Sequence, residues 1–163
     1  MKKNKNLKVS IVMGSQSDYK TMRLIEKILS KMSIKFETKI ISAHRTPKRM
    51  FKFAESAEKN NISVIIAGAS GSAHFPGMIA ALTSIPVIGV PIESKKLKGL
   101  DSILSIVQMP KGIPVGTVAI GKDGAINAGL YAASIISIFD ASVKRSLNYW
   151  RKKQSMSVKK KPK

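Results

Sequence analysis

Cysteine is absent from the chain, and histidine occurs only twice, at positions 44 and 74. Without cysteine the protein has no disulfides, thiolate metal ligands or cysteine nucleophile, which is typical of proteins of the reducing cytosol. We therefore expect a cytoplasmic protein. Two histidines without cysteine are too few for the usual zinc site, so no metal site is predicted.

Acidic residues are scarce: the chain has nine Asp and Glu against 29 Lys and Arg, and its net charge is +20. Four of the cations lie in residues 1–8 and nine in residues 144–163. We predict a basic N-terminal tail over residues 1–8, a single α/β domain over residues 9–150, and a basic, disordered C-terminal tail over residues 151–163. Basic tails can bind RNA or an anionic membrane. No nucleic-acid-binding motif accompanies them, so nucleic acid is not expected as a partner.

One long segment lacks charge: residues 60–92 contain no Asp, Glu, Lys or Arg. That length could span a bilayer. The segment nevertheless carries Asn60, Asn61, His74 and several Gly and Pro, and it divides into a strand, a turn, a helix and a second strand. The buried strands of a parallel sheet explain such runs better, so no membrane association is expected.

Short β-branched runs alternate with longer helical patterns along the chain. The strands lack polar alternation, which predicts burial on both faces. Repeated strand–helix units imply right-handed crossovers and a parallel sheet with helices on both faces. The predicted fold class is α/β, a three-layer sandwich of flavodoxin-like or Rossmann-like type. The predicted strands are 8–13, 36–41, 64–67, 87–90 and 115–120; the predicted helices are 18–32, 47–60, 76–83, 101–108 and 125–139, of which the last could continue toward residue 150.

In such a sheet, ligands bind outside the carboxyl ends of the strands, where this sequence is most distinctive. The first strand ends in Gly14, which suits a tight turn, and Ser15, Ser17 and Asp18 follow where a helix begins. These side chains either cap that helix or help its amides to bind an anion. Asp18 also suits a ribose diol, because a carboxylate accepts two hydrogen bonds. The turn is neither a Walker A loop nor a G-x-G-x-x-G fingerprint.

The second strand leads into a turn over residues 42–47. Its Arg45 can bind a phosphate through two parallel hydrogen bonds, and His44 can carry a proton at neutral pH. Thr46 and Pro47 suit the N-cap and the first position of a helix. Helix capping explains Thr46 and Pro47 but leaves His44 and Arg45 unexplained.

The third turn, over residues 68–74, consists of small residues followed by His74. Small side chains let backbone amides approach a planar or anionic ligand, although close packing of a helix on the sheet would use the same residues. Both histidines thus occupy matching strand-to-helix turns at one edge of the sheet. We interpret them as parts of one site where a proton is moved, rather than as two ordinary loop histidines.

At these residues the chain resembles class I N5-carboxyaminoimidazole ribonucleotide mutase, the PurE family of purine biosynthesis. The resemblance extends from Val9 to Phe139, outside the basic ends. Ser70, Ser72 and Phe75 depart from the family pattern, yet they keep the third turn small and apolar. The matching motifs are residues 14–18, 42–47, 71–78, 86–91, 100–110, 118–121 and 127–128.

The resemblance implies an isomerase that moves a carboxyl group of an aminoimidazole ribonucleotide from the exocyclic nitrogen to ring carbon C4, without metal or cofactor. It implies that His44 is the acid–base catalyst. It also implies a homo-octamer, and the apolar helix over residues 125–139 gives weak independent support for an oligomer. The residues that the resemblance assigns to the substrate are Ser15, Ser17, Asp18, Ser42 and Arg45, at the nucleotide and its phosphate, and Gly71 and His74, at the carboxylate and CO2.

Three other functions stay open on sequence alone. A direct AIR carboxylase shares the fold and uses free CO2, although residues 71–78 favour the mutase type. A non-catalytic flavodoxin-like nucleotide-binding module would need aromatic residues over a flavin ring, and the strand-end loops offer only Tyr19 and Phe75. An RNA- or membrane-associated protein would work through the basic tails.

Overall fold

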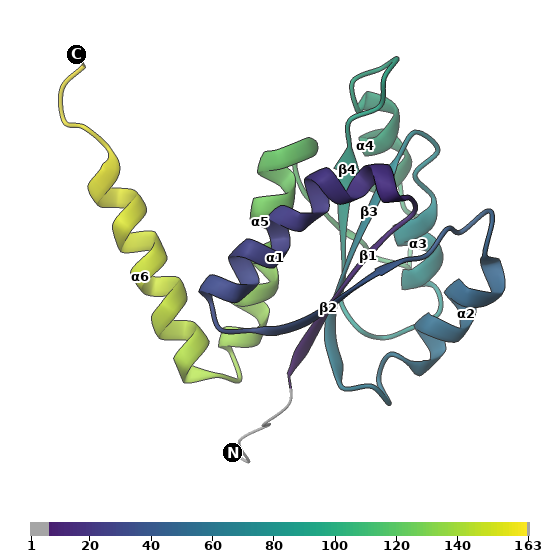
Figure 1. The fold of residues 1–163 in the computed structure, drawn as a ribbon, viewed down its shortest axis with the longest axis horizontal. Coiled ribbons are helices and arrows are strands. Elements are labelled where there is room, and N and C mark those ends of the chain that lie inside the picture. The colour runs from purple at the N-terminus through teal and green to yellow at the C-terminus, as the bar shows by residue number, and fades with distance from the viewer. Residues whose placement is uncertain (1–6, 163) are drawn as a thin grey trace.

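Runs of Val and Ile form the central strands of a five-stranded parallel sheet, because β-branched side chains pack well on a pleated surface (Figure 1). The computed structural model describes residues 7–162. The strands are β1 (Lys8–Met13), β2 (Lys35–Ile40), β3 (Ile62–Ser70), β4 (Val87–Ile92) and β5 (Gly116–Thr117). The helices are the 3-10 helix η1 (Gln16–Asp18), α1 (Tyr19–Lys31), α2 (Pro47–Ser56), α3 (Phe75–Ala80), α4 (Leu100–Val107), α5 (Gly121–Ser137) and α6 (Ala141–Ser157).

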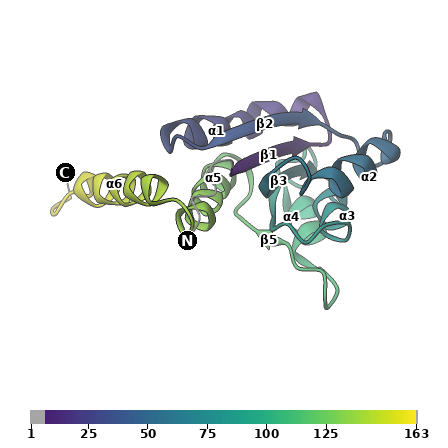
Figure 2. The ribbon, with the colours of Figure 1, turned by 90° about the horizontal axis from the view of Figure 1, so that it is seen from below.

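The strand order is β2-β1-β3-β4-β5, and all neighbours are parallel. This is the flavodoxin-like order, in which the chain changes direction across the sheet between β1 and β3. Figure 2 shows β1 and β2 running the same way, toward α2. The predicted α/β class is confirmed, and the order selects the flavodoxin-like alternative. A ligand site is expected at the carboxyl ends of β1 and β3.

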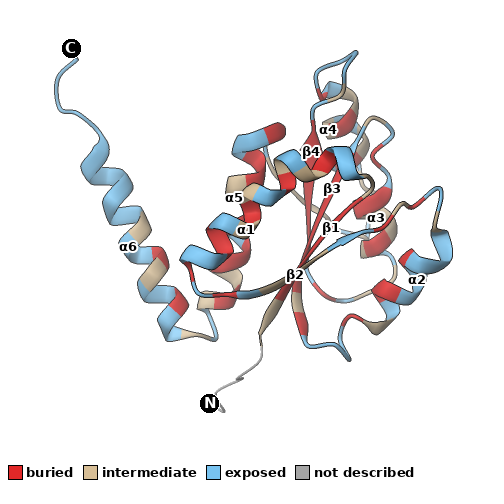
Figure 3. Ribbon diagram, viewed as in Figure 1, coloured by how far each residue is buried: buried red, intermediate tan, exposed pale blue. Residues whose placement is uncertain are grey.

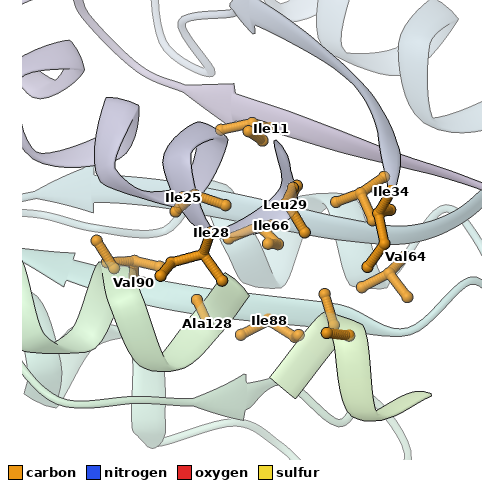
Figure 4. Close-up of a cluster of buried hydrophobic side chains, with 14 of the residues drawn as sticks. Ile11, Ile25, Ile28, Leu29, Ile34, Val64, Ile66, Ile88, Val90 and Ala128 are labelled. Carbon is orange, nitrogen blue, oxygen red and sulfur yellow. The ribbon is translucent and has the colours of Figure 1, made fainter. Parts of the chain in front are cut away.

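Two apolar cores lie on the two faces of the sheet. Alternate residues of β3 point to opposite faces, so Val64 and Ile66 join the core beneath α1 and α5, while Ile65 joins the core beneath α2 and α3. Figure 4 shows the first core, in which Ile28 of α1 lies among strand and α5 side chains. Helix α5 approaches α1 closely because the residues on its inner face are small. A Cβ atom at Gly129 would lie only 2.9 Å from Ile28 of α1. Helices on both faces confirm the predicted three layers.

The two edge strands differ from the sequence prediction. Strand β2 was predicted to be buried on both faces, but its residues are half-buried or exposed because only β1 pairs with it. Its polar Glu37 accepts hydrogen bonds from Lys8 at 2.9 Å and Lys39 at 2.7 Å. Lysines on an edge strand oppose pairing with other chains. Strand β5 has only two residues, not six, because it pairs with β4 through Gly116 and Thr117 alone.

The C-terminal third also differs from prediction. The expected helix over 125–139 begins earlier, at Gly121, and a separate helix α6 follows it (Figure 1). The break lies at Asp140, whose carboxylate accepts the amides of Ser142 and Val143 as an N-cap. Helix α6 continues through residues 151–157, where the sequence predicted a disordered tail; Lys, Arg, Gln and Met there are good helix formers. Figure 3 shows most of α6 exposed.

The predicted N-terminal tail falls mostly on residues 1–6, which lie outside the described residues. Its last residue, Lys8, is the first residue of β1. Within residues 7–162, no helix combines the length and apolar character needed to cross a membrane.

Candidate functional site

The carboxyl ends of β1, β2 and β3 surround a pocket of about 320 Å³. Three turns form its walls: residues 14–18, residues 42–47 (the His44 turn) and residues 70–75 (the His74 turn). Five of the sequence-predicted site residues lie in the lining together, although they are up to 30 positions apart in the sequence. The lining residues are Gly14, Ser15, Asp18, Ser42, Ala43, His44, Arg45, Ala69, Ser70, Ser72 and Phe75.

The first turn presents two hydroxyls above a buried carboxyl group. Ser15 Oγ and Ser17 Oγ are 2.8 Å apart, and Ser15 Oγ accepts the Ser17 amide at 3.2 Å. The hydroxyl of Ser15 caps η1, and Ser15 also lines the pocket, so the cap does not exclude the anion-binding role, which stays a prediction. Asp18 is only 3% exposed. Burial raises the pKa of its carboxyl group above the model-compound value, and hydrogen bonds with the Ser15 backbone and the Ser70 and Ser17 hydroxyls oppose this.

The His44 turn holds itself together with short-range hydrogen bonds. Thr46 Oγ1 donates to the Ser42 carbonyl at 2.9 Å and accepts the Ser42 amide at 3.1 Å. Pro47 opens α2, as predicted. Thr46 occupies the N-cap position, but its hydroxyl makes no cap hydrogen bond because it bonds Ser42 instead. His44 and Arg45 are left exposed to the pocket.

Arg45 extends from the His44 turn toward the first turn. Its Nε donates to Ser42 Oγ at 3.3 Å, and its Nη2 donates to the Gly14 carbonyl at 3.4 Å. These bonds fix one edge of the guanidinium group at Gly14, next in the chain to Ser15, whose hydroxyl-bearing side chain also lines the pocket. Ser17 is not among the lining residues. A guanidinium group and hydroxyls arranged in this way are suited to a phosphate.

The two histidines face each other across the sheet edge. Their ring centroids are 5.9 Å apart, with the ring planes at 88°. His44 lines the pocket, whereas His74 precedes α3 and lies beside it without being part of the lining. Their distance supports the interpretation that both imidazoles belong to one site, which stays a prediction.

Gly71 differs from its expected place. It has a left-handed backbone (φ +67°), and it is absent from the lining, which includes its neighbours Ser70 and Ser72. Its amide donates to Ser102 Oγ at 2.9 Å, so that amide is bonded within the protein rather than directed to a ligand. The sequence names Ser70 only as a departure from the family pattern and does not assign it to the site, yet its hydroxyl donates to Asp18 Oδ1 at 3.5 Å. Its position at the carboxyl end of a buried strand is the signal that could have identified it.

A larger hollow of about 580 Å³ lies at the opposite end of the sheet, where α5 passes into α6. Ile34, Phe139 and Arg145 are among its lining residues. It contains neither histidine and lies at the amino ends of β1 and β2, whereas parallel α/β sheets bind ligands at the carboxyl ends. The position of His44 and the location at the carboxyl ends of the strands therefore favour the 320 Å³ pocket as the functional site.

The fold and this pocket define a flavodoxin-like α/β protein with a polar site at the switch point of its sheet. The chain belongs to the AIR carboxylase family, whose family model matches residues 8–157.

Individual relatives agree with this assignment. The chain is 54% identical over 156 residues to the N5-carboxyaminoimidazole ribonucleotide mutase of Escherichia coli K12, across 96% of this chain and 92% of that protein. It is 55% identical over 150 residues to the bifunctional purine synthesis protein purC/E of Dictyostelium discoideum, across 92% of this chain but only 15% of that longer protein. Among solved structures, Treponema denticola PurE superposes with a TM-score of 0.83 at 27% identity, covering 93% of each chain.

Proposed function

We propose that this protein is an isomerase of purine biosynthesis that converts N5-carboxyaminoimidazole ribonucleotide to 4-carboxy-5-aminoimidazole ribonucleotide. The observation that carries this proposal is the 54% identity, over nearly the whole of both chains, to a protein named as that mutase. The pocket supports it, because three motifs of the resemblance, at residues 14–18, 42–47 and 71–78, contribute to its lining.

The proposed reaction moves one carboxyl group and one proton. The bond between the exocyclic nitrogen and the carboxyl carbon breaks, CO2 is released within the site, and the nitrogen takes up a proton. Carbon C4 then attacks the CO2, and loss of the C4 proton restores the aromatic ring. One imidazole that gives the first proton and takes the second returns to its starting state. His44 is the proposed imidazole, because it lines the pocket next to Arg45.

The nucleotide would be held by the first turn and the His44 turn. Arg45 would bind the phosphate, with the hydroxyls of Ser15, Ser17 and Ser42 around it. Asp18 would accept hydrogen bonds from the ribose diol. His74, 5.9 Å from His44, would stand beside the carboxylate and the CO2. Gly71 would support this end of the site through its backbone.

A homo-oligomer, the octamer that the resemblance implies, is also part of the proposal. Four apolar residues at spacings of three and four are more than half or about half exposed: Leu97 at 58%, Leu100 at 54%, Leu104 at 51% and Val107 at 50%. Leu97 lies in the turn before α4, and the other three residues lie on the helix. Such an apolar stripe is typical of a surface that another copy covers. Sedimentation should therefore show no monomer at micromolar concentration. We further propose a cytoplasmic location.

A carboxyl-transfer assay tests the function directly. Purified protein should convert N5-carboxyaminoimidazole ribonucleotide at a rate that added bicarbonate does not change. A direct carboxylase would instead need aminoimidazole ribonucleotide and bicarbonate, and would not use the N5-carboxy compound. A flavin spectrum that stays with the protein after gel filtration would favour the flavodoxin-like module.

A further inference from the structure

Ser102, in the first turn of α4, is one of three fully or almost fully buried polar residues in the part of the chain that the structure describes. Its side chain is 0% exposed. Its hydroxyl donates to the Ile92 carbonyl at the end of β4, at 2.7 Å, and accepts the Gly71 amide at 2.9 Å. A buried hydroxyl that both donates and accepts joins two backbone segments that would otherwise have unsatisfied groups.

Asp101 and Ser94 hold Ser102 in place. Asp101 Oδ1 accepts the Ser102 amide at 3.0 Å and the Ser94 hydroxyl at 2.8 Å. Ser94 Oγ in turn accepts the amides of Leu97 and Gly99 at 3.3 and 3.4 Å. These bonds fix the start of α4 to the loop after β4. Ser102 then links this fixed end of α4 to the His74 turn.

The Gly71 backbone sets the direction of the next three residues. From its left-handed conformation, the Gly71 carbonyl accepts the Ala73 amide at 2.7 Å, and the Ser72 carbonyl accepts the His74 amide at 2.9 Å. The Ser105 hydroxyl gives the Gly71 carbonyl a weaker bond at 3.4 Å. A shift of the Gly71 amide would therefore move Ser72, which lines the pocket, and His74, which faces His44.

We propose that Ser102 is a positioning residue, which holds the His74 turn at the distance from His44 that the carboxyl transfer needs. This inference rests on the proposed function. Ser102 makes no contact with Ser15, Asp18 or Arg45 among the hydrogen bonds of the described residues, so its loss should spare nucleotide binding. A displacement of this kind can cost about 10²-fold in turnover without removing any reacting group.

The experiment uses Ser102→Ala together with Ser102→Cys, whose thiol keeps the volume but bonds weakly. We expect kcat to fall by about 10- to 10²-fold in Ser102→Ala, and less in Ser102→Cys, with KM little changed. We also expect both variants to release free aminoimidazole ribonucleotide, since CO2 would escape before it is recaptured. Amide hydrogen exchange at Gly71 should accelerate in the same order.

Two controls separate positioning from loss of stability. Ser56→Ala removes a hydroxyl that bonds a backbone carbonyl, that of Phe53, away from the His74 turn. Ile25→Val weakens the core beneath α1 and lowers thermal stability without touching either turn. Both control variants should keep wild-type kcat and release no free aminoimidazole ribonucleotide.

The possible outcomes are distinct. The proposal would be overturned if a folded Ser102→Ala variant kept normal kcat and released no free aminoimidazole ribonucleotide. It would also be overturned if Ile25→Val, with the same loss of thermal stability, released as much of it. If Ser102→Ala does not fold, Ser102→Cys decides by the same criteria. If the wild type shows no carboxyl transfer, the proposed function fails; unchanged Gly71 exchange in the variants would then overturn the positioning role separately.

Discussion

The two histidine turns have the same place in their strand–turn–helix units, yet they are held in opposite ways. The His44 turn follows the edge strand β2 and is stabilised mainly by bonds between Ser42 and Thr46. Among the described residues, one side-chain hydrogen bond ties it to another element, from Arg45 to Gly14 at 3.4 Å. The His74 turn follows the central strand β3 and is bonded by the buried Ser102 of α4.

The difference matches the chemistry proposed for each turn. A turn with few bonds to other elements has little that opposes local motion, so we expect the His44 turn to adjust around an entering nucleotide. A turn bonded to a buried hydroxyl keeps its shape, so the His74 turn can provide a fixed wall for a small molecule such as CO2. We therefore expect one side of the site to adapt to the nucleotide and the other to be preorganised.

The largest effect is expected from His44→Asn, which removes the proposed proton carrier from the adaptable turn. Asn retains a polar group of similar width but cannot titrate near neutral pH. Turnover should fall by at least about 10²-fold, the usual contribution of a positioned acid–base group. Nucleotide affinity, measured by calorimetry, should stay close to wild type. Retention of a tenth or more of wild-type turnover would exclude this role for His44.

Arg45→Lys tests the phosphate contact of the same turn. Lys keeps the charge but cannot place two parallel hydrogen bonds on a phosphate. Nucleotide affinity should weaken about tenfold, equivalent to ~1.4 kcal/mol, while kcat at saturating substrate changes less. Lys48→Arg, on the adjacent exposed turn of α2, is a matched control that should change neither quantity. An unchanged affinity in Arg45→Lys would remove Arg45 from the site.

Paired glycine substitutions compare the backbones of two turns. Gly71→Ala introduces a Cβ at φ +67°, with no atom closer than 3.9 Å, so its cost is backbone strain of about 1–2 kcal/mol in the free energy of unfolding. Gly14 is not among the glycines with positive φ, and a Cβ there would meet nothing closer than 3.8 Å. Gly14→Ala should therefore cost less than about 0.5 kcal/mol, because the turn at this position does not need a left-handed backbone. Equal losses in urea denaturation would contradict this contrast.

Asp18→Asn should change how stability depends on pH. Because burial raises the pKa of the native carboxyl group above 3.8, the native state holds this proton more tightly than the unfolded chain does. Wild-type stability from this group is present at low pH and declines as pH rises from 3.8 through the raised pKa. The variant lacks this decline, so its stability relative to wild type should rise over that interval and then level off. Parallel curves of unfolding free energy against pH for wild type and variant would contradict this prediction.

Local sequence patterns were enough to predict the sheet and much of the site. Each β-branched run and each turn motif lies within a few residues, and parallel strands bring their carboxyl ends together, so Asp18, His44 and Arg45 could be placed at one edge. The bond between Gly71 and Ser102 joins residues 31 apart, and nothing in either segment alone indicates it. The exposure of β2 likewise depends on strand order, which the sequence left undecided. Asp140 followed by Ser142 and Val143 is a local N-cap signal, and it marks the break between α5 and α6.

The smallest effect is expected from the C-terminal segment. Helix α6 leaves the body beside α1 and α5, on the side away from the turn between β2 and α2 (Figure 1). Removal of residues 158–163, which follow α6, should therefore leave kcat unchanged and both histidine turns undisturbed. Their cations can still attract an anionic nucleotide, an effect that salt screens. Any loss should thus be confined to kcat/KM at low ionic strength. Replacing Lys159, Lys160 and Lys161 with Gln, at full length, should reproduce that loss if charge is its cause. A fall in kcat at physiological salt would instead show that this segment reaches a site, its own or that of a neighbouring copy.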